Sequence, residues 1–305
     1  MNIILCIPTL NGASSSKFLI ESLYLQNIYP SGIFVIDSDS SDGTPDLWNS
    51  AGANVTNIPV SSFNHGATRQ LALTLCPDAD ILIYMTQDAI LASPEAIKNI
   101  LQPFEDEKVA AVCGRQLPHA DASPISAHAR LYNYPAVSSV KEVADIPCIG
   151  VKTAFISNSF AAYRSKALEE VGGFPSDVIF GEDTYVAAKM LNAGWKVAFA
   201  ADATCYHSHN YSIKEEFERY FDIGVFHSRE KWFIDSLGKA EGEGKKFVLS
   251  EQKYLLQTAP WLIPSALIRT GIKLVGYKLG QCEAKLPLWL KKIISMNKGY
   301  WKKSG

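Results

Sequence analysis

The strongest constraint on the fold is a series of short apolar runs within the first 113 residues, at positions 3–7, 33–36, 55–60, 81–85 and 109–113. Runs of this length are typical of strands buried on both faces of a parallel sheet. The segments between them predict helices at about 16–27, 45–51, 66–75 and 94–104. Alternating strands and helices predict an α/β fold, an open sheet with helices on both faces.

Polar motifs follow these strands at their carboxyl ends, where open α/β sheets bind ligands. Asp37, Asp39 and Asp42 stand within six residues after the second run. Such acids can accept hydrogen bonds from a base or ribose, although a turn with a helix cap needs the same residue types. Asp88 follows the fourth run, where it could ligate a divalent cation between protein and phosphates or simply cap a helix.

Three further motifs carry residues that could do chemistry. Arg69 opens a predicted helix, within a segment that could be a plain N-terminal cap or could offer a guanidinium to a phosphate. Gly181-Glu182-Asp183 opens another helix, where acids complement the helix dipole or one serves as a general base. His207 and His209 alternate after a strand predicted at 195–200 and share one face, either as structural residues or as ligands.

Composition and missing motifs exclude several classes of protein. Of 305 residues, 47% are hydrophobic and 20% charged, which excludes disordered and collagen-like chains. There is no Gly-x-Gly-x-x-Gly turn, no Walker lysine loop and no Gly-x-Ser-x-Gly elbow. Dinucleotide oxidoreductases and the common serine hydrolases are therefore disfavoured, as is a nucleotidyltransferase, which would need a glycine-rich signature with a lysine near the first strand.

The second half of the chain is less regular. Residues 115–150 show no clear period, so they are either functional loops or contain elements that the pattern hides. Beyond them we expect helices at 166–171, 182–192 and 214–233, and a linker at 239–246. Because loops usually select the substrate, we expect 115–150 to shape a substrate-binding site.

Several features predict a location on the cytoplasmic side of a membrane. The six cysteines lie 35 to 77 residues apart, which fits neither a disulfide framework nor a metal knuckle. No apolar run reaches the roughly 18 residues that span a bilayer, and no signal peptide is evident. The sequence thus indicates reduced thiols in the cytoplasm.

The net charge of −2 hides a strong asymmetry: residues 261–305 carry nine Lys or Arg and one acid, and the remainder carries −10. Basic segments with apolar residues lie on anionic membranes, and Trp261, Trp289 and Trp301 could anchor this one at the interface. Alternatively, the basic segment packs on the acidic part of the chain or forms a homodimer. Nucleic acid is a poorer partner, because the rest of the chain is acidic.

Taken together, the motifs resemble the family-2 inverting glycosyltransferases of the GT-A fold. The matching pieces, in order, are Ile7-Pro8-Thr9-Leu10-Asn11, Asp37-Ser38-Asp39-Ser40-Ser41-Asp42-Gly43-Thr44, Gln87-Asp88, Val171-Gly172-Gly173-Phe174 and Gly181-Glu182-Asp183. The segments around Arg69, Ser157-Asn158-Ser159-Phe160, His207-Ser208-His209 and Arg219 are similar to those of bacterial rhamnosyltransferases that build O-antigens and other surface polysaccharides.

The resemblance covers about residues 3–230 and implies a GT-A domain over 1–235. The helical, basic segment over 236–305 is expected, from its composition, to associate with a membrane or an interface. It implies a nucleotide-sugar donor, dTDP-L-rhamnose for this subfamily, and a lipid-linked glycan acceptor at the inner face of the cell membrane. The residues that would bind the donor are Pro8, Thr9, Asn11, Asp37, Asp39, Arg69, Gln87 and Asp88.

The resemblance also implies a metal and a base. Asp88 matches the last acid of the family's Asp-x-Asp motif, but Thr86 and Gln87 replace the earlier acids, so a further ligand to Mg²⁺ or Mn²⁺ is needed. We expect His207 to be that ligand, with His209 the second choice. Asp183 matches the catalytic base. The alternatives are a family member that uses another nucleotide sugar and a degenerate, non-catalytic GT-A binding module.

Overall fold

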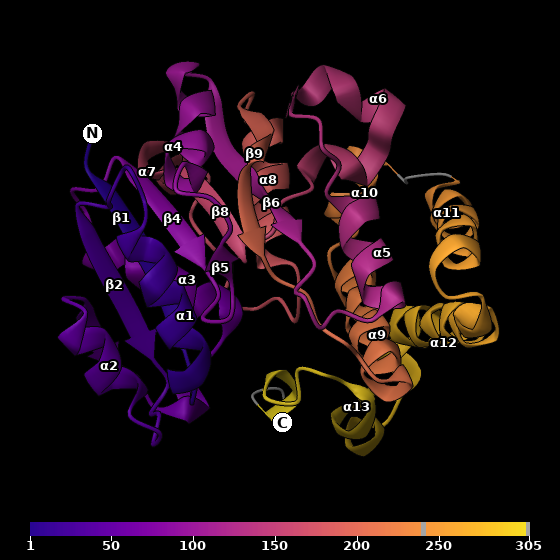
Figure 1. The fold of residues 1–305 in the computed structure, drawn as a ribbon. Coiled ribbons are helices and arrows are strands. Elements are labelled where there is room, and N and C mark those ends of the chain that lie inside the picture. The colour runs from indigo at the N-terminus through magenta and orange to yellow at the C-terminus, as the bar shows by residue number, and fades with distance from the viewer. Residues whose placement is uncertain (239–241, 303–305) are drawn as a thin grey trace.

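The computed structural model describes residues 1–238 and 242–302 and contains one mixed sheet flanked by helices (Figure 1). Within the described chain the sheet has nine strands in the order β3-β2-β1-β4-β8-β6-β9-β5, with β7 paired to β9. The strands are β1 (Ile3–Thr9), β2 (Gly32–Asp37), β3 (Asn54–Asn57), β4 (Ile81–Met85), β5 (Ile90–Leu91), β6 (Val109–Leu117), β7 (Ser139–Lys141), β8 (Phe160–Arg164) and β9 (Lys196–Tyr206).

The α-helices surround this sheet and extend beyond one end of it. They are α1 (Ala13–Tyr24), α2 (Thr44–Ser50), α3 (His65–Leu75), α4 (Ala96–Leu101), α5 (Pro124–Asn133), α6 (Ile146–Ile149), α7 (Ser165–Glu170), α8 (Glu182–Asn192), α9 (Ile213–Arg229), α10 (Lys231–Leu237), α11 (Glu243–Thr258), α12 (Ile263–Gln281) and α13 (Leu288–Ile294). Helices on both faces of an open sheet confirm the predicted α/β class.

The parallel half of the sheet follows the sequence pattern closely. Strands β1, β2, β3 and β4 pair in parallel, and β4 is buried along its whole length. The third strand is shorter than predicted and ends at Asn57, because Pro59 precedes a 3₁₀ turn over 60–62 and cannot donate to a ladder. All four strands present their carboxyl ends to the same edge of the sheet.

The other half of the sheet is mixed, which the sequence did not predict. β8 is antiparallel to both β4 and β6, while β6 and β9 are parallel. β5 and β7 are short strands that pair antiparallel with β9. Residues 115–150 contain the end of β6 together with α5, β7 and α6, so this stretch does hold elements that its weak periodicity hid.

Two apolar clusters fill the two faces of the sheet. Leu19 of α1, Trp48 of α2 and Ile97 of α4 pack on one face, and all three are fully buried. Val186 of α8 and Phe221 of α9 are fully buried on the other face, together with side chains of α3, α7 and α10. These layers fix the carboxyl ends of the central strands, and hence the candidate site residues, on a rigid frame.

The predicted helix over 214–233 is two helices, because the chain leaves helical geometry at Glu230, between α9 and α10. Residue 235, where the predicted first domain ends, lies inside α10. Part of the predicted linker, 239–241, lies outside the described residues. The remainder is wrong as a linker, since Glu243 already begins α11.

The segment after residue 235 packs closely on the rest of the protein through glycines at the crossing of α9 and α12. A Cβ atom at Gly280 would lie 2.1 Å from the carbonyl oxygen of Phe221, and one at Gly224 would lie 2.2 Å from that of Tyr277. Only residues without a side chain let the two backbones approach this far. The basic segment is thus built onto α9, as one of the predicted alternatives had it.

Ion pairs between the basic segment and acidic residues accompany this packing. Glu216 of α9 contacts Arg269 at 3.1 Å and Lys273 at 3.2 Å. The expectation that Trp301 anchors a membrane is wrong, because its side chain is 1% exposed and lies under Arg229 and Lys291. Trp261 and Trp289 are 74% and 63% exposed. None of the helices in the described ranges is long and apolar enough to cross a bilayer.

Candidate active site

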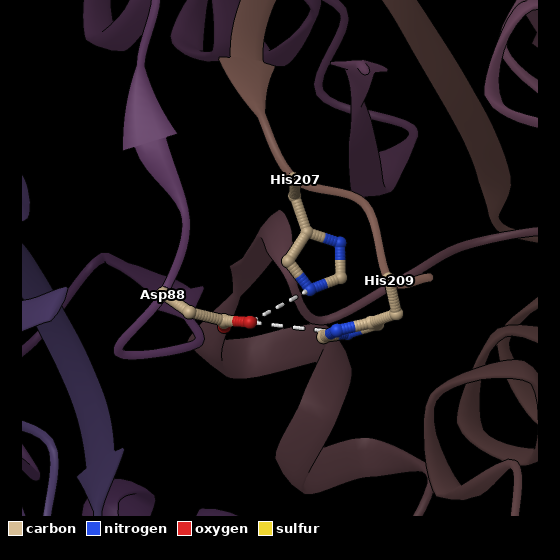
Figure 2. Close-up of side chains that lie close together, drawn as sticks. All are labelled: Asp88, His207 and His209. Carbon is tan, nitrogen blue, oxygen red and sulfur yellow. Dashed lines mark ion pairs between the residues drawn. The ribbon is translucent and has the colours of Figure 1, made fainter. Parts of the chain in front are cut away.

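The sheet register brings Asp88 and the two histidines together. β5 pairs antiparallel with the end of β9, with Ile90 opposite Tyr206, so the residues before β5 lie beside those after β9. Nε2 of His207 is 3.6 Å from Oδ2 of Asp88, and Nε2 of His209 is 3.8 Å from the same oxygen. Figure 2 shows both rings directed at that carboxylate. The predicted ligand and its second choice therefore both lie beside Asp88, and their role as ligands stays a prediction.

A hydrogen-bond network behind His207 orients its ring. Nδ1 of His207 is 3.0 Å from Oε1 of Gln116, and Arg130 donates to the same oxygen at 2.5 Å. An amide oxygen can only accept, so Nδ1 carries the proton and Nε2 keeps its lone pair on the side of Asp88. Gln116 in turn donates to Ser157 Oγ at 2.9 Å, which fixes the amide. This support is typical of a metal-ligating histidine.

The protonation states also suit a metal. Burial lowers the pKa of His207 to about 3 and lowers that of His209. Burial opposes ionisation of Asp88, but the neighbouring His207 and other contacts more than offset it and lower the pKa of its carboxyl. At neutral pH the cluster offers two neutral imidazoles and one carboxylate within 4.8 Å of one another, which is a donor set that fits a divalent cation.

The two neighbouring acids at the start of α8 have opposite environments. Gly181 adopts φ 72°, a left-handed conformation that glycine tolerates, and places Glu182 and Asp183 in the first helical turn. Glu182 is buried and pairs with Arg69 at 2.8 Å, and this guanidinium, followed by His65, offsets burial and lowers the pKa of the carboxyl. Glu182 is thus an ionised structural partner of Arg69.

Asp183 has no cationic partner within the described chain. Burial, followed by the negative charge of Glu182, raises the pKa of Asp183 to about 6. Its Oδ2 accepts a hydrogen bond from the backbone N–H of Asn158 at 3.2 Å, and its Oδ1 accepts one from that of Thr184 at 2.8 Å. Two adjacent carboxyls whose pKa values are driven apart are a common arrangement at sites of general acid–base chemistry.

The segment Ser157–Ser159 connects the metal cluster to the candidate base. Its first residue accepts from Gln116, its second donates its backbone N–H to Asp183, and the third has Oγ 3.5 Å from Nε2 of His207. One three-residue segment before β8 therefore touches both groups and holds them at the same edge of the sheet.

Asp37 lies at the carboxyl end of β2, and neighbouring protein groups hydrogen-bond both oxygens of its carboxylate. Its carboxylate accepts from the hydroxyls of Thr9 at 2.7 Å and Ser40 at 2.6 Å, and from the Ser40 backbone N–H at 2.7 Å. Asp39, by contrast, is exposed and adopts φ 64°. The structure therefore makes Asp37 the organiser of a turn that displays Asp39.

The loop after β1 is held by side chains predicted to meet the donor. Gln87 accepts from the backbone N–H of Leu10 at 3.0 Å and donates to the Leu10 carbonyl at 3.1 Å. Asn11 accepts from the backbone N–H of Ser41 at 2.9 Å. Pro8 is half-buried at the end of β1. These residues lie along the edge of the sheet that also carries Asp88, and they brace its loops.

The Arg69 side chain is buried and engaged by groups of the protein itself. Its side chain is 6% exposed and donates to the His65 carbonyl at 3.0 Å as well as pairing with Glu182. The Asn64 side chain accepts from the Ala67 N–H at 2.9 Å, so the cap interpretation of this segment is confirmed. A role for Arg69 in holding the donor stays a prediction.

Comparison with known proteins identifies the family. The model of Glycosyl transferase family 2 matches residues 4–172. The chain is 50% identical over 302 residues to the O-antigen chain rhamnosyltransferase RfbN of Salmonella typhimurium (strain LT2), covering 99% of this chain and 96% of that protein. The chain belongs to glycosyl transferase family 2. This family-2 protein is a glycosyltransferase, which confirms the predicted enzyme class.

A second relative supports the family, and two solved structures share the fold. The family-2 protein is 45% identical to the O-antigen chain rhamnosyltransferase WbaN of Salmonella anatum, over 97% of this chain and 95% of that one. A Pyrobaculum calidifontis mannosyltransferase in complex with GDP-Man and Mn²⁺ aligns with TM-score 0.58 and 21% identity, over 99% of this chain and 85% of that one. S. aureus TarS in complex with UDP aligns with TM-score 0.54 and 14% identity, over 93% and 91%. The predicted GT-A fold is confirmed.

The candidate base and the two histidines of this glycosyltransferase lie beyond the matched residues 4–172. Gln116 and the Ser157–Ser159 backbone were missed as functional residues. No local motif marks Gln116, whose role depends on Arg130 and His207, both distant in the sequence. Ser157–Ser159 was noticed only as part of a family likeness, and the contact between its backbone and Asp183 is a tertiary feature.

Proposed function

We propose that this glycosyltransferase is a metal-dependent, inverting enzyme that transfers L-rhamnose from dTDP-L-rhamnose to a lipid-linked oligosaccharide during O-antigen synthesis. The observation that carries the proposal is the 50% identity to the O-antigen chain rhamnosyltransferase RfbN over nearly the whole of both chains. WbaN, 45% identical, bears the same description. The preserved length supports a common reaction and not merely a common donor-binding fold.

Asp183 is the proposed base. Its carboxylate would take the proton from the acceptor hydroxyl while that oxygen attacks the anomeric carbon from the face opposite the leaving nucleoside diphosphate, so the configuration inverts. The raised pKa of about 6 supports this role, because a base is most effective when its pKa lies near the working pH. The hydrogen bonds from Asn158 and Thr184 would hold the carboxylate in place through the reaction.

Asp88, His207 and His209 are the proposed metal ligands. A bound divalent cation supplies charge that offsets the negative charge growing on the departing diphosphate. The presence of two imidazoles favours Mn²⁺ over Mg²⁺, which prefers oxygen ligands throughout. Gln116 would keep Nε2 of His207 available by fixing the proton on Nδ1.

The proposed donor site is a hollow of about 640 Å³ beside this cluster, lined by Ser14, Asp88, His119 and His209 among others. Ser14 belongs to the first turn of α1, and the positive end of a helix dipole favours a diphosphate. Asp39 is the proposed contact to the nucleoside, displayed by the turn that Thr9, Asp37 and Asn11 brace. Arg69 would act indirectly, by holding Glu182 beside the base.

We further propose that the enzyme works at the cytoplasmic face of the inner membrane. Trp261, Trp289 and Ile293 are exposed on the C-terminal helices, in the segment with nine basic residues and one acid. Exposed aromatic and basic side chains together favour an anionic lipid surface. Association of two chains through the same face is the alternative, and sedimentation with and without anionic vesicles separates the two.

Titration calorimetry with dTDP-L-rhamnose, UDP-GlcNAc and GDP-mannose, each with Mn²⁺ and then with EDTA, tests the donor and the metal. Selective, Mn²⁺-dependent binding of the thymidine nucleotide is the expected result. Selective binding of another nucleotide sugar would keep the family mechanism and overturn the rhamnose assignment. Equal binding with EDTA would overturn the role of the metal in donor binding.

A further inference from the structure

A second hollow, of about 740 Å³, adjoins the donor hollow at His209 and Tyr211 and lies among α5, α9, α11 and α12. Figure 1 shows these four helices together at one end of the molecule, beyond the sheet. His209 lines both this hollow and the donor hollow. We propose that this pocket, called the helical pocket below, binds the phosphate-bearing, apolar end of the acceptor. This inference rests on the proposed function, in that the ligand is taken to be a lipid-linked acceptor.

The charge of the helical pocket is strongly positive. Six lysine or arginine side chains and two glutamates line it. Glu216 contacts both Arg269 and Lys273, and Glu243 contacts Lys152, so the acids leave an excess of cations. Arg130, Arg219 and Lys245 also line the pocket and have no acidic partner within the described residues. A pocket of this kind favours an anion with more than one negative charge.

Two arginines of the pocket carry buried donors that lack a partner. Nε of Arg130 and Nε of Arg269 are both buried and have no hydrogen bond within the part of the chain that the structure describes. Leaving a buried donor unpaired is unfavourable, so such groups point to an acceptor that the protein itself does not supply. Phosphate oxygens are suitable acceptors for guanidinium groups.

The remaining walls are aromatic and apolar. Lys273 Nζ lies 5.8 Å from the ring centres of both Tyr220 and Phe247, and Phe247 packs edge-on against Tyr132 at 5.1 Å. At the surface the lining continues to Leu249 and Leu274, which are 60% and 58% exposed. A cationic interior that continues into exposed aliphatic side chains matches an amphiphile with an anionic head and a hydrocarbon chain.

Contacts also connect the pocket to the reaction centre. Tyr211, two residues after His209, packs on it at 5.2 Å and accepts a hydrogen bond from Arg269 at 2.8 Å through its carbonyl. Arg219 lies 4.9 Å from the ring of Phe180, which immediately precedes the Gly181-Glu182-Asp183 turn, and 5.8 Å from the ring of Tyr211. A ligand in the pocket would therefore have its sugar end directed toward His209 and Asp183.

Calorimetry on the full-length protein with farnesyl diphosphate, a short-chain probe, tests the proposal. We expect farnesol and inorganic diphosphate each to bind at least about tenfold more weakly than the probe, because each lacks half of the recognised chemistry. The affinity of farnesyl monophosphate should lie between that of farnesyl diphosphate and that of farnesol. An affinity equal to that of the diphosphate would indicate a site for a single phosphate. Saturating dTDP should not compete, since the donor hollow is separate. Competition by dTDP would place the probe in the donor hollow and overturn the proposal.

Matched variants on α12 locate the probe. Lys273→Gln removes a lining cation and should weaken binding about tenfold, the effect of losing one charge-assisted hydrogen bond. Lys278→Gln removes the same charge from an exposed position outside the lining and should leave affinity within about twofold. Leu274→Ser should weaken binding several-fold, whereas Leu267→Ser, at a side chain 51% exposed outside the lining, should not. Equal loss in both members of a pair would overturn the pocket as the site.

The outcomes separate this inference from the proposed function. Because Leu274 and Leu267 are exposed, their variants should keep the native melting temperature, which circular dichroism checks. Probe binding that depends on Lys273 and Leu274 in a protein that fails to bind dTDP-L-rhamnose would retain the pocket and reject the donor. Selective binding of dTDP-L-rhamnose without any probe binding would retain the donor and reject the pocket.

Discussion

The two halves of the active-site edge use polar side chains in opposite ways. At the ends of β1 and β2, Asp37 and Gln87 have their oxygens engaged by neighbouring protein groups. On the side formed by β8, β9 and α8, Asp183 accepts longer hydrogen bonds, from Asn158 and Thr184 at 2.8 to 3.3 Å, and Nε2 of His207 meets Ser159 Oγ at 3.5 Å. Burial shifts the pKa values of both Asp183 and His207. Polar residues at strand ends therefore mark the edge of the sheet that carries the candidate site. The hydrogen-bond partners of each residue decide whether it stabilises a loop or is available for ligand binding and catalysis.

The largest effect on activity is expected from replacing Asp183, on the catalytic side of the comparison, with Asn. We expect kcat to fall about 10³-fold, because an amide cannot accept the acceptor's proton. Donor affinity should stay within a few-fold, since Asp183 is not among the donor hollow's lining residues. Radiolabelled sugar transfer and calorimetry measure the two quantities. A large loss of donor affinity with unchanged kcat would show that Asp183 binds the donor and does not act as the base.

The second-largest effect is expected from removing Gln116, which hydrogen-bonds His207 behind the metal cluster. Gln116→Leu removes the acceptor that holds the proton on Nδ1 of His207, and we expect Mn²⁺ affinity to fall about 10- to 100-fold. Excess Mn²⁺ should restore most of the activity, because the ligands themselves remain. Activity measured across a Mn²⁺ titration checks this. An activity loss that excess Mn²⁺ leaves unchanged would indicate general damage to the fold.

The pH profile follows from the raised pKa of Asp183. The base must be deprotonated, so kcat/KM should decline by about tenfold per pH unit below a pKa of about 6 and level off above it. His207 remains neutral through this window, because its pKa is about 3. Initial rates between pH 5 and 8 at saturating Mn²⁺ give the profile. A flat profile over that range would contradict the assigned base.

The smallest effect is expected on the bracing side of the comparison. Gln87→Ala removes two hydrogen bonds to the backbone of Leu10, and we expect about 1–2 kcal/mol less stability toward urea. The KM for the donor should rise a few-fold while kcat changes little. Asp46→Ala, at the exposed first turn of α2, is the control and should alter neither quantity appreciably. A fall in kcat as large as that of Asp183→Asn would place Gln87 among the reacting groups.

The sequence pattern predicted the parallel half of the sheet because β1, β2 and β4 are apolar runs next to helices. β3 is more polar, and its side chains are exposed or half-buried. The pattern did not predict β5, β7 and β8, because β5 and β7 are two or three residues long and depend on pairing with β9, and β8 lies in an Ala-rich stretch. The sequence analysis placed His207 beside Asp88 only because the family resemblance required a further metal ligand. The physical cause, the antiparallel register of β5 with β9, joins segments more than a hundred residues apart.

Local patterns could not reveal the protein partner of Arg69 either. An arginine at the start of a helix near a strand end suggests an anion ligand, and no acid stands close to it in the sequence. Glu182, its partner at 2.8 Å, lies more than a hundred positions later. The charge state of Asp183 likewise depends on burial and on Glu182 held ionised beside it, and neither can be read from the motif alone.

The glycine crossing of α9 and α12 has a consequence for engineering acceptor preference. Since the backbones meet at Gly224, Gly276 and Gly280, a foreign α12 with any side chain at the last two positions would collide with the resident α9. A hybrid that receives a foreign α12 should therefore fold when glycines stand at positions 276 and 280 of that helix, and should fail when larger residues stand there. If the helical pocket binds the acceptor as proposed, these glycines limit which foreign α12 helices can be used to change acceptor preference.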